Sequence, residues 1–208
     1  MADRLTTGVG VLDRKLDGGI PAGSTVTLCA PPASQGELFL YGLTATRGTL
    51  YLTLGRTEAT VASSIRGSST PTGDPTIRHI DGDATLDKAT KLVGALPEAS
   101  NLIVDPVDVL ERERTDRYRN FLNELQNHMQ NTQGLAVLYC LDGNNVPEGR
   151  DMTRHMADVV FDLERHVGSD TVENRLTVPK FRGGRALTEV VKLELSEGVG
   201  IDTSRDIA

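Results

Sequence analysis

The residues with the most chemical information form an octapeptide at the place of a phosphate-binding loop. It comprises Ala30, Pro31, Pro32, Ala33, Ser34, Gln35, Gly36 and Glu37. A working loop, G-x-x-x-x-G-K-[ST], uses glycines to wrap backbone N–H groups around phosphates, a lysine on the β- and γ-phosphates and a hydroxyl on Mg²⁺. On that pattern Ala30 and Gln35 replace the two glycines, Gly36 replaces the lysine and Glu37 replaces the hydroxyl residue. The spacing fits triphosphate binding, but the residue types do not.

The charge change in this loop is large. Gly36 removes a cation and Glu37 adds an anion beside the place of a polyphosphate. One like-charge contact near 4 Å costs about 4 kcal/mol at an effective dielectric constant of 20, which is about three decades of affinity. We therefore expect no ordinary ATP binding here. A strand-to-helix turn that never bound a nucleotide is the alternative interpretation.

The elements around the loop predict an α/β fold. An apolar run precedes the loop at 25–30, and further buried strands are expected at 49–54, 76–80, 101–105 and 134–141. Helices are expected from 37, from 57 or 60 to 67, at 85–96 and at 111–130. Continuous apolar strands that alternate with helices indicate a parallel sheet covered on both faces. Beyond Asp158 three consecutive strands, 159–164, 175–181 and 189–196, indicate antiparallel pairing.

Length and composition restrict the possible classes. The 208 residues fit one domain spanning 1–208. A net charge of −7 disfavours a broad electrostatic grip on nucleic acid. No apolar run approaches the roughly 20 residues of a membrane helix, and the first residues carry no apolar signal region, so a cytoplasmic location is expected. Arginine provides 17 of 22 basic residues and aspartate 17 of 29 acidic ones, which fits a salt-rich cytoplasm or a bias in genome composition.

The two cysteines lie in apolar, strand-like runs. Buried free cysteines such as Cys29 and Cys140 usually act as small hydrophobic side chains. The chain has no C-x-x-C motif and no histidine cluster, so a zinc site is not expected.

Several segments together resemble the RecA/RadA/KaiC-like ATPase superfamily. They are Thr7-Gly-Val-Gly-Val-Leu-Asp13, Asp17-Gly-Gly-Ile-Pro-Ala-Gly-Ser24, Asn101-Leu-Ile-Val-Asp105, Asp158-Val-Val-Phe-Asp-Leu163 and Lys180-Phe-Arg182-Gly183. The resemblance covers nearly the whole chain and is greatest to haloarchaeal members with a degenerate Walker A loop. It implies a RecA-like P-loop domain with a mainly parallel central sheet, helices on both faces and a C-terminal antiparallel hairpin. Residues 1–24 then form a lead-in and residues 158–202 the antiparallel strands.

The resemblance also implies roles for particular residues. Asp105 matches the Walker B acid that helps to hold Mg²⁺, although an acid capping the turn at Pro106 is an alternative. Gly55 and Arg56 stand where KaiC-like enzymes carry the glutamate pair that activates water, and the nearby Glu58 fits the first turn of a helix. The loop strand neighbours the strand after Walker B, so Cys29 and Cys140 should lie on adjacent strands as reduced thiols.

Lys180 and Arg182 match residues that reach the nucleotide of a neighbouring subunit in this superfamily, like an arginine finger. Positions i and i+2 of a strand share a face, so both cations should point the same way. A solvated sheet edge is the alternative.

These observations favour a non-hydrolysing pseudo-ATPase that acts as a regulatory or assembly protein through family-type subunit contacts. We expect protein partners in a homo- or hetero-oligomer, no nucleic acid partner and no cofactor. One alternative is a divergent ATPase that binds ATP and Mg²⁺, with Glu37 and Asp105 as metal ligands. Another is a recombinase paralogue in DNA repair that binds single-stranded DNA.

Overall fold

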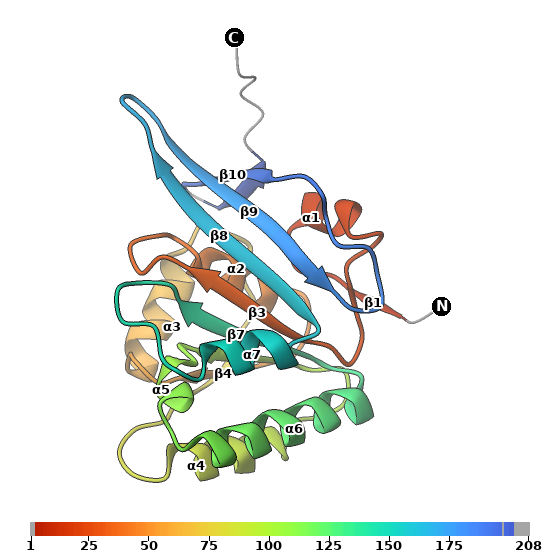
Figure 1. Ribbon diagram of the computed structural model, residues 1–208, viewed down its shortest axis with the longest axis vertical. Coiled ribbons are helices and arrows are strands. Elements are labelled where there is room, and N and C mark those ends of the chain that lie inside the picture. The colour runs from red at the N-terminus through yellow and green to blue at the C-terminus, as the bar shows by residue number, and fades with distance from the viewer. Residues whose placement is uncertain (1–2, 197, 202–208) are drawn as a thin grey trace.

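A computed structural model describes residues 3–196 and 198–201, so residues 1–2 of the expected lead-in and residues 197 and 202 of the expected C-terminal strands lie outside the described residues. Within this part of the chain a nine-stranded sheet forms the centre of the molecule, in the order β11-β10-β9-β8-β3-β7-β6-β4-β5 (Figure 1). Its strands in chain order are β3 (Thr25–Ala30), β4 (Thr49–Thr53), β5 (Thr76–His79), β6 (Asn101–Asp105), β7 (Leu135–Leu141), β8 (Val159–Val167), β9 (Val172–Phe181), β10 (Val191–Leu195) and β11 (Val199–Ile201).

The sheet is parallel from β8 to β5 and antiparallel from β8 to β11. This confirms the mainly parallel sheet with antiparallel C-terminal strands. One detail differs from the expectation, because β8 first pairs in parallel with β3, from Val26 opposite Val159 to Cys29 opposite Asp162. The antiparallel part begins with the pairing of β8 and β9, which runs from Val159 opposite Phe181 to Val167 opposite Val172.

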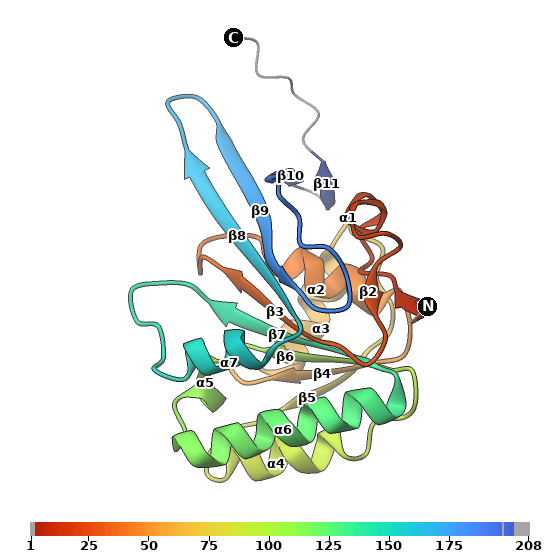
Figure 2. The ribbon, with the colours of Figure 1, turned by 45° about the vertical axis from the view of Figure 1, so that its right-hand side comes forward.

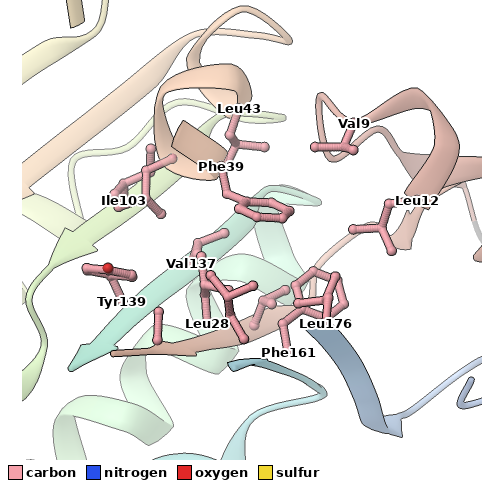
Figure 3. Packing of buried hydrophobic residues seen from close by; sticks show 14 of the residues in the cluster. Val9, Leu12, Leu28, Phe39, Leu43, Ile103, Val137, Tyr139, Phe161 and Leu176 are labelled. Carbon is pink, nitrogen blue, oxygen red and sulfur yellow. The ribbon is translucent and has the colours of Figure 1, made fainter. Parts of the chain in front are cut away.

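Helices cover both faces of the sheet. One face packs against α1 (Gly10–Lys15), α2 (Glu37–Thr44) and α3 (Glu58–Gly67), and the other against α4 (Thr85–Val93), α5 (Asp108–Glu111), α6 (Thr115–Thr132) and α7 (Arg150–Met156). Side chains of β7 alternate between the two cores, since Val137 and Tyr139 face α2 whereas Leu138 and Cys140 face the opposite helices. Figure 3 shows Val137 and Tyr139 on the side of α2. The buried strands are therefore apolar on both faces because helices pack against both faces of the sheet.

The lead-in and the long helix each differ from the sequence expectation in one respect. The lead-in contains α1 and a two-stranded antiparallel sheet of β1 (Arg4–Leu5) and β2 (Ile20–Pro21). The helix expected at 111–130 begins at Thr115, and Glu111 instead ends the separate one-turn helix α5. Glu111 is buried, although it begins a run of charged residues in the sequence.

The β8–β9 hairpin is longer than expected and projects beyond the rest of the sheet (Figures 1 and 2). Its outer half pairs Glu164 to Val167 with Val172 to Arg175. The last pair, Val167 and Val172, exposes 70% and 51% of its surface. The hairpin thus presents two apolar side chains at its tip.

The described helices include none that combines the length and the apolar character needed to cross a membrane.

Candidate functional site

The loop of residues 30–37 joins β3 to α2 at the carboxyl end of the parallel strands, the edge where ligands bind in open α/β sheets. Its polar groups hydrogen-bond within the loop. The Ser34 hydroxyl and backbone N–H both donate to the carbonyl of Pro31, at 2.7 and 2.9 Å. The N–H of Gly36 donates to the Ser34 hydroxyl at 3.3 Å. Two amides that a phosphate-binding loop would direct at its ligand are therefore already paired.

Two C-terminal strands hold the loop from outside. Arg165 of β8 donates to the carbonyl of Ala33 at 3.2 Å. With its amide nitrogen directed at β10, Gln35 donates to the carbonyls of Leu195 and Ser196 at 2.8 and 3.0 Å. The loop is thus held by the C-terminal strands β8 and β10, which lie more than 120 positions after it in the chain.

Tyr139 of β7 fills the space beneath the loop. A Cβ atom on Gly36 would lie 2.8 Å from the Tyr139 phenol oxygen and 3.0 Å from the Cβ of Ala30. Burial, followed by the negative charge of Glu37, raises the pKa of Tyr139 above its usual value, so the phenol stays neutral. Sequence reasoning missed this residue because a tyrosine inside the apolar run 135–141 is typical of ordinary core packing.

Asp105 is the last residue of β6 and accepts hydrogen bonds from two side chains of the same chain. It is 4% exposed and its Oδ2 accepts hydrogen bonds from the Tyr51 phenol and from Nη2 of Arg56, both at 2.6 Å. Burial, followed by the charge of Asp105, raises the pKa of Tyr51 well above its usual value, so Tyr51 keeps the proton that it donates. The carboxylate that matches the Walker B acid is therefore neutralised inside the fold.

Arg56 supplies that neutralising charge from the position matched to a water-activating glutamate. Its second nitrogen, Nη1, donates to the Tyr41 phenol at 3.3 Å. Burial lowers the pKa of the Arg56 guanidinium, but the negative charge of Asp105 and the hydrogen bonds to Asp105 and Tyr41 together raise it above its usual value. The nearby Glu58 lies in the first turn of α3, as expected, and accepts a hydrogen bond from the backbone N–H of His79 at 3.0 Å.

Lys180 and Arg182 both reach the carboxyl end of α7. Lys180 donates to the carbonyls of Arg154 and His155 at 3.0 and 2.6 Å. Arg182 donates to the carbonyls of His155 and Met156 at 3.1 and 3.2 Å. Two cations at a helix carboxyl end satisfy free carbonyls and complement the helix dipole. The structure therefore brings these residues together on one side, as expected, and gives them partners within the chain.

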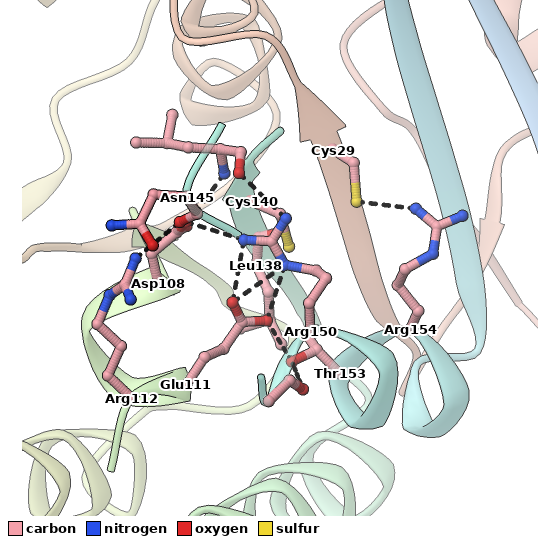
Figure 4. A network of polar contacts seen from close by, with 12 residues as sticks. Cys29, Asp108, Glu111, Arg112, Leu138, Cys140, Asn145, Arg150, Thr153 and Arg154 are labelled. Carbon is pink, nitrogen blue, oxygen red and sulfur yellow. Dashed lines mark hydrogen bonds and ion pairs between the residues drawn. The ribbon is translucent and has the colours of Figure 1, made fainter. Parts of the chain in front are cut away.

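A buried ionic network lies beside the loop, under α7 (Figure 4). Nε of Arg150 donates to both carboxylate oxygens of Glu111 at 3.0 Å, and Nη2 donates to Asp108 at 2.9 Å. Arg150 also donates to the carbonyl of Leu141 at the end of β7. The network attaches α5 and α7 to the carboxyl edge of the sheet. The sequence offered no signal for it beyond an isolated arginine in a short helix.

The two cysteines lie opposite each other on adjacent strands, β3 and β7, as expected, and both are free and buried. Over residues 3–196 and 198–201, no group of three or more histidine, cysteine, aspartate and glutamate side chains is placed to hold a metal ion.

Comparison with known proteins supports the fold. A crystal structure of the KaiC-like protein PH0186 from the hyperthermophilic archaeon Pyrococcus horikoshii OT3 matches with a TM-score of 0.77 at 15% sequence identity, and the match covers 97% of this chain and 100% of that one. At this identity the likeness shows a KaiC-like fold. No curated protein matches the chain. A family model described as a family of unknown function, DUF7125, matches residues 4–208, so the chain belongs to the DUF7125 family.

Proposed function

We propose that this protein is a KaiC-like pseudo-ATPase, which does not hydrolyse ATP and acts as a regulatory or assembly subunit. One observation carries the proposal: side chains of the chain itself occupy the positions of the nucleotide machinery. Tyr139 packs against Gly36, where a phosphate-binding lysine would stand, and Arg56 pairs with Asp105, which would otherwise help to hold Mg²⁺.

The residues present do not fit ATP with Mg²⁺. Phosphoryl transfer depends on positioned cations and on a group that orients the attacking nucleophile. The loop has no lysine, and Glu37 adds a negative charge at the position of the hydroxyl residue. Arg56 replaces a matched glutamate and takes the carboxylate of Asp105. Metal binding by Glu37 and Asp105 together would require Asp105 to give up its ion pair.

Isothermal titration of the purified protein with Mg-ATP tests the proposal. We expect no saturable heat at micromolar nucleotide and no rise in the unfolding temperature. A nucleotide that did bind would raise this temperature, since a ligand at 100 times its Kd stabilises the folded state by about 2.7 kcal/mol. Micromolar binding that is lost in Asp105→Ala and kept in Asp116→Ala would overturn the proposal. Asp116 is a suitable control because it is an exposed aspartate on α6.

The β8–β9 hairpin supports a role in assembly. Exposed apolar side chains at the tip of a projecting element favour contact with another protein surface. We propose a second copy of this chain as the partner for Val167 and Val172. Light scattering after size-exclusion chromatography should show an oligomer that dissociates in the Val167→Lys, Val172→Lys double variant. The matched control is Val190→Lys, because Val190 is also half exposed but precedes β10. A monomer at every concentration, or equal effects of both variants, would contradict this contact.

The role of Lys180 and Arg182 toward a neighbouring subunit's nucleotide stays a prediction. It requires both side chains to leave the α7 carbonyls that they contact in the structure.

A further inference from the structure

We propose that Cys29 and Cys140 form a reversible, peroxide-oxidised dithiol site, in which Cys29 is the attacking cysteine and Cys140 resolves its oxidised form to a disulfide. The proposal does not depend on how the protein treats nucleotides.

The placement of the two cysteines allows a bond between them. Cys29 and Cys140 are register partners on the adjacent parallel strands β3 and β7. Both side chains face the same core, on the side of α7. Neighbouring strands lie about 4.8 Å apart, and Cα atoms bridged by a disulfide lie about 4.4–6.8 Å apart. The strands therefore need no large movement to accommodate the bond.

A fixed positive charge distinguishes Cys29 from an ordinary core cysteine. Nη1 of Arg154 lies 3.2 Å from the sulfur of Cys29 (Figure 4). The guanidinium is held by two hydrogen bonds to Asp162, at 2.6 and 2.7 Å, and Asp162 is itself the register partner of Cys29 on β8. A guanidinium beside a sulfur stabilises the thiolate, which is the nucleophilic form.

The environments of the two thiols make Cys29 easier to ionise than Cys140, as the proposed reaction requires. The hydrogen bond with Cys140 lowers the pKa of Cys29; burial opposes this effect and the charge of Arg154 supports it. Burial raises the pKa of Cys140 well above its usual value. Cys29 is therefore the more easily ionised thiol. The Arg154 side chain that covers it is 35% exposed, so a side-chain movement can open a path for a molecule as small as hydrogen peroxide.

The chemistry balances with one peroxide molecule. The Cys29 thiolate attacks one peroxide oxygen, the O–O bond breaks, and the hydroxide that leaves takes up the proton released by Cys29. The sulfur is now a sulfenic acid and the peroxide has been reduced to water. The sulfur of Cys140 then attacks the Cys29 sulfur, the S–O bond breaks, and a second water leaves with the thiol proton. In a reducing compartment, thiol exchange returns the pair to its free form.

Intact-mass spectrometry of the full chain treated with hydrogen peroxide tests the site. We expect a loss of two hydrogens, about 2 Da, two thiols that resist alkylation after denaturation, and full recovery with dithiothreitol. Cys140→Ala should instead leave a sulfenic acid on Cys29 that dimedone traps. Cys29→Ala should leave Cys140 reduced. Circular dichroism and the urea midpoint establish that each variant is folded.

The role of the guanidinium has its own variant pair. Arg154→Gln should slow disulfide formation about tenfold, because it removes a charge-assisted interaction with the thiolate. Arg119→Gln, an exposed arginine on α6, should leave the rate unchanged. Two alkylatable thiols after peroxide treatment of the folded protein, a disulfide only between chains, or equal rates in both arginine variants would overturn the proposal.

Discussion

The ion pair between Arg56 and Asp105 allows a quantitative test of the idea that this chain has converted nucleotide-site positions into structural ones. Arg56→Met removes the guanidinium and keeps a side chain of similar length. Asp105, which is 4% exposed, then loses its cationic partner and keeps the hydrogen bond from Tyr51. Asp105→Asn removes the charge of the other partner and leaves an amide oxygen that can still accept from Tyr51.

The expected magnitudes follow from burial. Breaking a buried ion pair from one side costs about 3–5 kcal/mol. Because the Arg56 side chain is 29% exposed, solvent screens part of this, and we expect about 2–3 kcal/mol for Arg56→Met. Asp105→Asn should cost about 1–2 kcal/mol, since Arg56 can turn toward water. The double variant should cost about 2–3 kcal/mol, which gives a coupling energy of about 1–2 kcal/mol.

Urea unfolding followed by far-ultraviolet circular dichroism measures all four proteins of the cycle. For a chain of this length, the loss in Arg56→Met corresponds to a fall in Tm of about 5–10 °C. The exposed pair Arg114 and Asp116 has side chains that are 77% and 62% exposed and serves as the matched control, with an expected coupling below about 0.5 kcal/mol. A coupling at Arg56 and Asp105 no larger than that of the control would refute the reasoning.

Three further variants test neighbouring features by the same unfolding assay. Gly36→Ala should lower the free energy of unfolding by about 1–3 kcal/mol, because the added Cβ would contact Tyr139. Gly67→Ala should not lower it, because a Cβ there meets nothing within 4 Å. Equal effects of the two variants would show that the contact with Tyr139 does not limit position 36. Arg150→Met should cost about 3–5 kcal/mol and more than Arg56→Met, since only 6% of the Arg150 side chain is exposed; a smaller loss would show that the network is weak. Above pH about 10 the unfolded chain releases the Tyr51 proton while the folded chain keeps it, because the folded pKa is raised. Stability therefore falls as pH rises, and Tyr51→Phe should make this fall shallower by up to about 1.4 kcal/mol per pH unit; an unchanged slope would contradict the assignment.

The parts of the fold that sequence could predict are those with a local signal. The buried strands read as apolar runs bounded by glycine, proline or polar residues, and parallel sheets bury both faces of each strand. Thr57 marks the start of α3 because its side chain accepts a hydrogen bond from the N–H of Thr60. The outer half of the β8–β9 hairpin carries charged residues on both faces, so it has no burial pattern and its length was underestimated.

The contacts that define the candidate site have no such local signal. Arg56 and Asp105 are 49 positions apart in the chain, and Arg150 and Glu111 are 39 apart. Each pair depends on which strands are neighbours and on the end of the sheet at which they finish. The sequence could identify the altered loop residues individually, whereas the side chains that replace their interactions became visible only in the assembled sheet.

The packing of Tyr139 against Gly36 also restricts which side chains this chain can accept at position 36. A lysine introduced at position 36 would place its Cβ 2.8 Å from the phenol oxygen, so this substitution alone would lower the stability of the protein. A smaller residue at position 139 would have to arise beforehand, and by itself it would leave a void in the core. A phosphate-binding lysine therefore cannot be introduced at position 36 by single substitutions that are each neutral in stability.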